Sequence, residues 1–378
     1  MLKEKVVYFS PNGYLGGAER FVLEAAIGHQ KFGQYDVTIL FFNDGPGVSI
    51  FKQNGINCIV LKNTFKLTHP LKLFKAIKEI RSLQRRHQWK VINATMPYAH
   101  IVASLAFPFH ETLKKIWYQH GPVGGKLDLI ASFFPYNKIL FNSSYTQSAH
   151  ESQPLFYCDP SKHFLCPYGI PKTDVQVTES PFPSRHQRTI LTAGRICSWK
   201  GYETSLKALS NIFKNYPLEK ERCHLYIAGD VKVARDQKYY DDLQDLTRSL
   251  NLTKNVTFLG RREDLHVLMN QCDLYLHTSN IPEPFGLVVA EAMIQRAFVI
   301  GTNKGGTPDM LINKVTGLSF DSIGEGASRE LEENLLHAFN LMDRHPHLFH
   351  QIRENGYRLI CQKFNVPDMI KNLENYYE

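Results

Sequence analysis

The chain has 378 residues, of which 43% are hydrophobic, and a formal net charge of +8. This length exceeds one ordinary hydrophobic core and suits two domains of comparable size. The longest apolar run, residues 101–109, is far shorter than the ~20 residues of a membrane-spanning helix. A strand-like run follows the first residues directly and leaves no space for a leader peptide, so we expect a cytoplasmic protein.

The positive charge is concentrated in the first half of the chain. Residues 1–175 hold 20 Lys and Arg against 11 Asp and Glu, which gives +9, whereas the remainder holds 24 against 25, which gives −1. This asymmetry predicts an anionic partner for the first half, such as lipid headgroups, a phosphorylated acceptor or nucleic acid. Aromatic residues are sparse near the basic segment, which argues against a nucleic-acid surface.

In the first half, apolar strand-like runs alternate with amphipathic stretches. A helix is expected over residues 18–30, where Phe21, Val22, Ala25 and Ala26 share one face. The expected strands are residues 5–10, 35–42, 56–61, 91–95, 115–120 and 138–142. Such alternation predicts an α/β fold with a parallel sheet covered on both sides.

The same alternation of strand-like and amphipathic segments begins again in the second half. The expected strands are residues 190–194, 225–229, 256–260, 274–277 and 298–301, most of which end in glycine. Residues 171–188 are polar, contain three prolines and have the composition of a linker. We therefore expect two Rossmann-like domains with parallel sheets facing a central cleft: residues 1–170, joined by a C-terminal helix at 357–378, and residues 171–356.

Ligands of such sheets bind at the carboxyl ends of the strands, so the turns there are candidate sites. Gly16 and Gly17 follow the first strand and open a helix, where amides can face a phosphate; a plain glycine turn is the alternative. Arg195 and Lys200 share a loop bracketed by glycines and can converge on a diphosphate. The alternative for this pair is two solvated surface cations.

The turn at residues 283–291 combines two acids with a helix start. Glu283 precedes a helix expected at residues 287–293, where it can reach a sugar hydroxyl, and Glu291 lies within reach of a ribose diol. For Glu283 alone, an acid that complements the helix dipole is the alternative. The backbone amides expected to face an anion belong to Phe285, Gly286, Leu287 and Val288.

These segments, in this order and spacing, resemble the retaining glycosyltransferases of family 4, which have the GT-B fold, over nearly the whole chain. The most specific part is the pair Glu283 and Glu291, separated by seven residues that include Pro-Phe-Gly-Leu. Three positions depart from the family pattern. Asp309 stands where Glu is usual, residues 167–171 differ at the domain junction, and the turn after residues 227–230 lacks a second Gly-Pro.

The resemblance implies transfer with retention, no metal and no cofactor besides the co-substrate, a nucleotide-diphosphate sugar, for which we expect a UDP-sugar. It implies that Arg195 and Lys200 neutralise the diphosphate, that Glu283 holds sugar hydroxyls and that Glu291 holds the ribose. Gly16 and Gly17 would form the N-terminal donor loop. The backbone near Arg261 would contact the base, and His120 would lie beside the donor sugar. For His120, a structural histidine at a strand end is the alternative.

Residues 70–90 form a basic amphipathic segment. It can dock on an anionic membrane, or it can pack its apolar stripe on the sheet with its cations solvated. The expected acceptor is a glycan, a glycolipid or a small molecule, in cell-surface polysaccharide or glycolipid synthesis. The alternative function is a non-catalytic protein of the same fold that binds a nucleotide or an anionic polymer.

Overall fold

The computed structural model describes residues 3–108, 112–175, 180–183, 186–231 and 233–378. The chain divides into two compact units, Met1–Pro171 with Phe364–Glu378, and Lys172–Lys363. Residues 357–363, which we expected in the C-terminal helix of the first domain, belong to the second unit. Of the expected linker, residues 176–179 and 184–185 lie outside the described residues.

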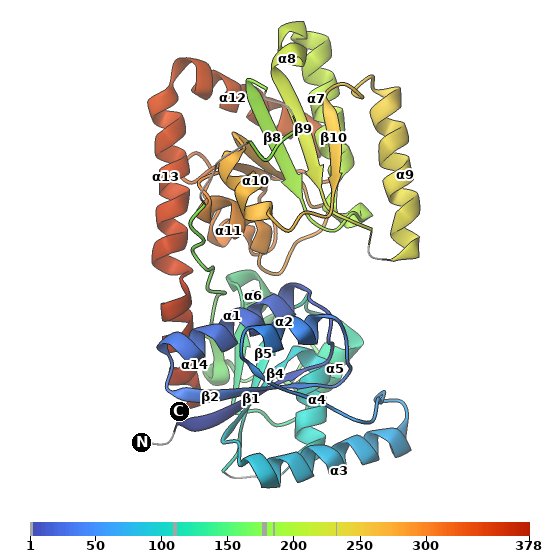
Figure 1. Cartoon of the computed structure of the whole chain (residues 1–378), viewed down its shortest axis with the longest axis vertical. Coiled ribbons are helices and arrows are strands. Elements are labelled where there is room, and N and C mark those ends of the chain that lie inside the picture. Colours follow the sequence, from blue (N-terminus) through green and yellow to red (C-terminus); the bar gives the residue numbers. More distant parts are fainter. Residues whose placement is uncertain (1–2, 109–111, 176–179, 184–185, 232) are drawn as a thin grey trace. The chain divides into compact units, whose positions relative to one another are not determined.

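The first unit contains a seven-stranded parallel sheet (Figure 1). Its strand order is β3-β2-β1-β4-β5-β6-β7. The strands are β1 (Glu4–Ser10), β2 (Tyr35–Phe41), β3 (Asn57–Val60), β4 (Val91–Thr95), β5 (Lys114–Gln119), β6 (Lys138–Phe141) and β7 (His163–Leu165). The six expected strands are all present. The edge strand β7 was not predicted, because three residues carry no recognisable periodicity.

The helices of the first unit follow its strands in alternation. They are α1 (Gly17–Phe32), α2 (Gly47–Gln53), α3 (Pro70–His87), α4 (Met96–Ala106), α5 (Lys126–Ser132), α6 (Ser144–Glu151), a 3₁₀ turn at Pro160–Lys162, and α14 (Val366–Tyr377). Helix α14 packs so closely on α1 that a Cβ added at Gly28 would lie only 2.7 Å from Cγ1 of Ile370. The hydroxyls of Tyr8 and Tyr377 also share a buried 2.7 Å hydrogen bond. These contacts fix the C-terminal segment to the first sheet.

The second unit contains a six-stranded parallel sheet of order β10-β9-β8-β11-β12-β13. Its strands are β8 (Arg188–Ala193), β9 (Cys223–Ala228), β10 (Val256–Gly260), β11 (Leu274–His277), β12 (Phe298–Thr302) and the unpredicted β13 (Leu318–Phe320). Its helices are α7 (Tyr202–Asn215), α8 (Pro217–Arg222), α9 (Ala234–Ser249), α10 (Leu265–Gln271), α11 (Leu287–Ile294), α12 (Glu325–Arg344) and α13 (Pro346–Lys363), with 3₁₀ turns at Ser198–Lys200 and Thr307–Asp309.

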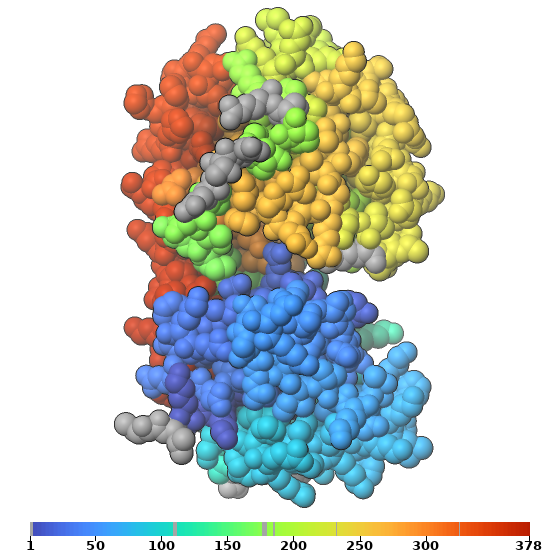
Figure 2. All heavy atoms as spheres, in the orientation of Figure 1, coloured from blue at the N-terminus to red at the C-terminus, as the bar shows by residue number. Residues whose placement is uncertain are grey.

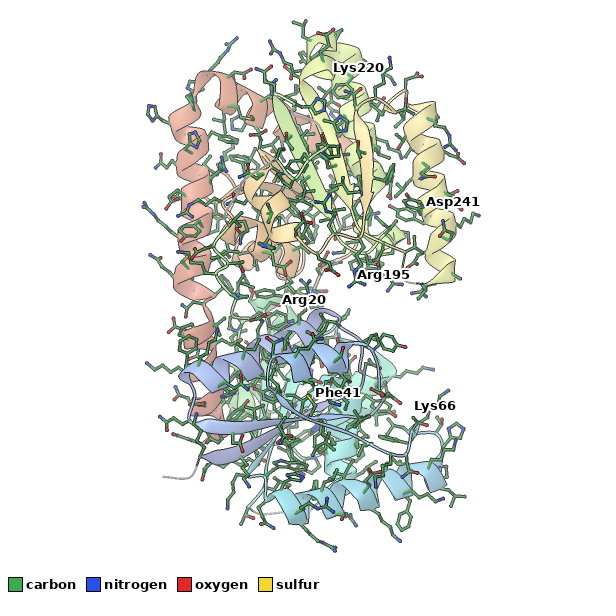
Figure 3. The ribbon with its side chains drawn as sticks, in the orientation of Figure 1. Arg20, Phe41, Lys66, Arg195, Lys220 and Asp241 are labelled. Carbon is green, nitrogen blue, oxygen red and sulfur yellow. The ribbon has the colours of Figure 1, made fainter. Side chains whose placement is uncertain are left out.

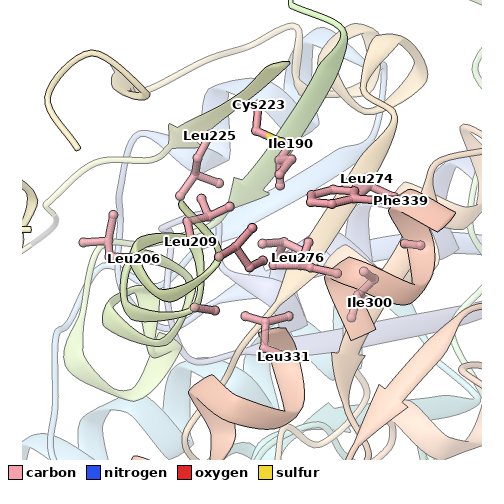
Figure 4. Close-up of a cluster of buried hydrophobic side chains, with 14 of the residues drawn as sticks. Ile190, Leu206, Leu209, Cys223, Leu225, Leu274, Leu276, Ile300, Leu331 and Phe339 are labelled. Atoms are coloured by element: carbon pink, nitrogen blue, oxygen red, sulfur yellow. The ribbon is translucent and has the colours of Figure 1, made fainter. Parts of the chain in front are cut away.

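The core of the second unit is an apolar cluster between the sheet and the helices α7 and α12 (Figure 4). Ile190, Leu209, Leu225, Leu276 and Leu331 are fully buried in it. Burial of apolar surface stabilises a fold by about 25 cal/mol per Å², so this cluster is the main contribution to the stability of the second unit. The α/β fold class is confirmed. Among the described residues, no helix is both long and apolar enough to cross a membrane.

The strand order of the second sheet determines where its ligand site can lie. The order reverses between β8 and β11, which are neighbours although 80 residues of chain separate them. At such a switch point the loops after the two strands leave in different directions and open a crevice. The loop carrying Arg195 and Lys200 follows β8, and the loop carrying Glu283 follows β11.

Candidate active site

The loop after β8 is fixed to the loop after β11. Gly201 has φ 64°, a left-handed conformation, and a Cβ there would collide with the carbonyl oxygen of Thr278. The hydroxyl of Thr278 donates to the carbonyl of Lys200 at 3.2 Å, and the amide of Asn280 donates to the carbonyl of Trp199 at 2.7 Å. These contacts bring the Lys200 side chain to the β11 loop.

Glu283 is a buried carboxylate that accepts three hydrogen bonds on one oxygen. Nζ of Lys200 donates to Oε1 at 2.7 Å, Nε2 of His277 at 2.9 Å, and the Ser279 hydroxyl donates to the same atom. Burial by itself raises the pKa of Glu283, but attraction to Lys200 and His277 outweighs burial and holds the pKa well below its usual range. Within the described residues, all hydrogen bonds to this carboxylate end on Oε1, which leaves Oε2 for a ligand.

His277 was not predicted as a site residue. It is the last residue of β11, and its Nδ1 lies 3.3 Å from the hydroxyl of Thr302 at the end of β12. Because the carboxylate can only accept, Nε2 of His277 carries a proton and donates to Glu283. The signal in the sequence was a polar side chain at the carboxyl end of an apolar strand, six residues before Glu283.

The expected helix after Glu283 is present as α11. Gly286 has φ 84° immediately before it, and a Cβ there would lie 2.7 Å from the Thr307 methyl group. Leu287 and Val288 occupy the first two helical positions, where amides have no acceptor within the helix. Glu291 lies about one turn further along, and Phe285 is buried.

The loop between β12 and the 3₁₀ turn at Thr307–Asp309 holds the backbone of Glu283 in place. The amide of Gly306 donates to the carbonyl of Glu283 at 2.8 Å, and Glu283 forms an isolated parallel bridge with Gly305. Gly305 has φ 71° and no room for a Cβ beside the Glu283 backbone. The glycine pair at residues 305–306, which by itself indicated only a turn, therefore has a specific packing role.

Arg195 and Lys200 contact different carboxylates, Asp236 and Glu283. Arg195 lies beyond the carboxyl ends of β8 and β9 (Figure 3), where Nε and Nη2 donate to Oδ2 of Asp236 at 2.9 and 2.5 Å. Asp236 is a buried residue of α9 that the sequence did not indicate. Arg261 is largely exposed, with Nη2 3.8 Å from Glu263.

Three predicted site residues, His120, Gly16 and Gly17, lie in the first unit. His120 follows β5; its Nδ1 is 2.8 Å from the Tyr168 hydroxyl, and its buried Nε2 has no hydrogen-bond partner among the residues that the structure describes. Burial lowers the pKa of His120 to about 3, so the ring is neutral near pH 7. The amide of Gly16 donates to the Glu19 carboxylate at 3.1 Å, and Gly17 is the first residue of α1.

The chain is similar to several known glycosyltransferases. Residues 178–357 match the model of the family described as Glycosyl transferases group 1. The chain is 24% identical over 354 residues to Alpha-1,3/1,6-mannosyltransferase ALG2 of Mus musculus, covering 82% of this chain and 83% of that protein. It is 23% identical over 436 residues to ALG2 of Rhizomucor pusillus, covering 98% and 90%.

Two solved structures show the same fold. HepE of Anabaena, crystallised with UDP, superimposes with a TM-score of 0.82 at 21% identity over 98% of both chains. A glycosyltransferase of Rickettsia africae gives 0.83 at 20% identity, over 99% of this chain and 98% of that one. The predicted resemblance to glycosyltransferases with the GT-B fold is thereby confirmed, whereas retention at the anomeric carbon stays a prediction. Together with the two parallel sheets, these similarities identify the chain as a nucleotide-sugar-dependent glycosyltransferase of the GT-B fold, whose residues 178–357 match the model of Glycosyl transferases group 1.

Proposed function

We propose that the protein transfers a hexose from a UDP-sugar to a glycan or glycolipid acceptor, with retention at the anomeric carbon and without a metal. The observation that carries this proposal is the buried pair Lys200 and Glu283, at 2.7 Å, beside the start of α11. A cation, helix amides and a carboxylate with one free oxygen suit a ligand that carries phosphates and hydroxyls together.

The roles follow from charge and reach. Lys200 and Arg195, with the first amides of α11, stabilise negative charge on the departing diphosphate, as a metal does in other enzymes. Oε2 of Glu283 accepts from a hydroxyl of the transferred sugar, because Oε1 is already occupied. Glu291 accepts from the ribose, and the backbone near Arg261 contacts the base.

In the first unit, the neutral ring of His120 has the chemistry to accept from a sugar hydroxyl through Nε2. The backbone amide of Gly17, at the start of α1, has the chemistry to bind a phosphate. In the transfer step the bond from the anomeric carbon to the phosphate oxygen breaks and the bond to the acceptor oxygen forms on the same face. The departing phosphate oxygen takes the acceptor's proton, so no protein base is required.

The choice of donor is supported by HepE, crystallised with UDP and glucose and with UDP-glucose, whereas the ALG2 relatives are mannosyltransferases. The test is a panel of UDP-glucose, UDP-galactose, UDP-N-acetylglucosamine and GDP-mannose, with slow release of nucleotide diphosphate as the readout. We expect hydrolysis with one UDP-sugar and its loss in Glu283→Ala. Arg329→Ala, which changes an exposed side chain of α12, is the control. No release with any donor, and no thermal stabilisation by UDP or GDP, would contradict the proposal.

We also propose that the enzyme works at an anionic membrane surface, docked through α3. The inner face of this helix packs on the first sheet through Ala76 and Ile80. Its outer face carries exposed cations beside Leu71 and Phe74, which are 80% and 55% exposed. Figure 2 shows the atoms of this segment at the surface of the first unit. The exposed cations of the helix are Lys72, Lys75, Lys78, Arg81, Arg85 and Arg86.

Each such cation contributes about 1 kcal/mol close to an anionic surface. Co-sedimentation with vesicles containing phosphatidylserine should therefore exceed co-sedimentation with neutral vesicles. The triple variant Lys72→Glu, Lys75→Glu, Lys78→Glu should abolish the difference. Equal and negligible pelleting of the unaltered protein with both kinds of vesicle would contradict the membrane proposal and would not affect the proposal for the donor site.

A further inference from the structure

Arg195 is bound along one edge of its guanidinium group. Nε and Nη2 both donate to Oδ2 of Asp236, at 2.9 and 2.5 Å. The Asp236 side chain is 9% exposed, whereas that of Arg195 is 28% exposed. The pair therefore consists of a buried anchor and a cation that still reaches solvent.

A guanidinium group has two edges that can bind an anion with two hydrogen bonds: the side edge, Nε with Nη2, and the end edge, Nη1 with Nη2. Asp236 occupies the side edge. Within the described residues, Nη1 of Arg195 takes part in no hydrogen bond, and it is not buried. The end edge is thus available to a second anion while the first remains bound.

Asp236 is itself held in place. It lies in the first turn of α9, and its amide donates to the carbonyl of Val233 at 2.9 Å. A carboxylate at this end of a helix is favoured by the helix dipole. The neighbouring Arg235 is 81% exposed, with Nε 3.6 Å from the other carboxylate oxygen, Oδ1. The anchor is therefore set by the helix, independently of any ligand.

We propose that Asp236 is a positioning residue for the donor diphosphate: it fixes Arg195 by the side edge so that the end edge meets the phosphates. This rests on the proposed donor site. A long side chain fixed before the ligand arrives loses less conformational entropy on binding. The opposite role, in which Asp236 competes with the diphosphate for Arg195, would require the carboxylate to cover the end edge, and it covers the side edge.

The experiment measures the affinity of the full chain for UDP and for UMP by calorimetry. Phosphate recognition is read from the ratio of the two affinities, which a general loss of structure would not change selectively. In Asp236→Ala we expect UDP binding to weaken about tenfold and UMP binding to stay within about twofold. Arg195→Ala should show the same selective loss of UDP affinity. The double variant should bind UDP no more weakly than Arg195→Ala does. Asp241→Asn, an exposed acid on the same helix (Figure 3), is the control and should match the unaltered protein.

Three outcomes would overturn the positioning role alone: tighter UDP binding in Asp236→Ala, equal weakening of UDP and UMP, or losses that multiply in the double variant. The proposed donor site itself would be rejected if the unaltered protein bound UDP no more tightly than UMP and GDP no more tightly than GMP. The two failures are therefore distinguishable in one series of titrations.

Discussion

Nζ of Lys200 lies 2.7 Å from Oε1 of Glu283, so the cation expected at the diphosphate and the acid expected at the sugar bind each other. Both side chains are only about one tenth exposed, at 11% and 12%. The pair joins the loop after β8 to the loop after β11, across the switch point of the sheet. A donor that bonds to both residues therefore finds their positions already set.

Removing the carboxylate of Glu283 should cost both stability and activity. Breaking a buried ion pair leaves Lys200 uncompensated, so Glu283→Ala should lower the free energy of unfolding by about 3 kcal/mol. It should also lower kcat/KM about 100-fold. The measurements are urea unfolding and steady-state kinetics. In Glu283→Ala with Lys200→Met, stability should recover in part while activity stays low; additive losses in stability would show that the pair is not coupled.

His277 should act on catalysis through Glu283. His277→Ala removes one of three donors to Oε1 and frees the carboxylate to turn, so kcat should fall about tenfold. His277→Gln retains a donor and should recover part of that loss. Steady-state measurement of kcat and of KM for the donor in the two variants tests this expectation. If the Ala and Gln variants behaved alike, hydrogen bonding by His277 to Glu283 would not be the cause.

Four buried histidines predict how stability depends on pH. Burial lowers the pKa of His100 and of His120 to about 3 and the pKa of His150 and of His224 to about 4, against 6.5 in an unfolded chain. Below about pH 6.5 the unfolded chain binds protons that the folded chain does not, so stability falls as pH falls. The slope should approach about 1.4 kcal/mol per pH unit for each histidine. Urea unfolding between pH 7 and pH 5 measures it, and His100→Phe should reduce the slope.

Glu283 acts in a separate and more acidic window. Its lowered pKa means that it stabilises the fold above the unfolded value of about 4.3 and that this contribution is lost as pH falls below it. Between pH 6.5 and pH 5, Glu283→Gln should therefore leave the slope of stability against pH unchanged. A changed slope in that range would contradict the assignment of this window to histidines.

Gly201 should be intolerant of any side chain. Its φ of 64° and the nearby Thr278 carbonyl oxygen both exclude a Cβ, so Gly201→Ala should destabilise by about 2 kcal/mol or more and displace Lys200. Gly55 is a matched control: its φ is 71°, but among the described residues no heavy atom beyond Gly55 and its chain neighbours lies within 4 Å of its Cβ position. Gly55→Ala should cost about 1 kcal/mol. Equal losses in thermal unfolding would mean that the collision at Gly201 is relieved cheaply.

The sequence by itself determined the elements with strong local patterns. Alternating apolar runs predicted eleven strands because each is long enough to show its pattern and to end at a turn residue, and Pro284 with Gly286 predicted the start of α11. Strands β7 and β13 have three residues each and carry no such pattern. The family resemblance pointed to Arg195, Lys200 and Glu283, because the signature around Glu283 is specific.

The tertiary structure alone decided which of these side chains meet. Lys200 and Glu283 are 83 residues apart, and Arg195 and Asp236 are 41 apart. Their contacts follow from the placement of β8 between β9 and β11, a pairing of distant strands that no local pattern encodes. His277 and Asp236 escaped prediction for the same reason: a polar residue at a strand end or in a helix's first turn becomes part of a site only when the sheet order brings a partner to it.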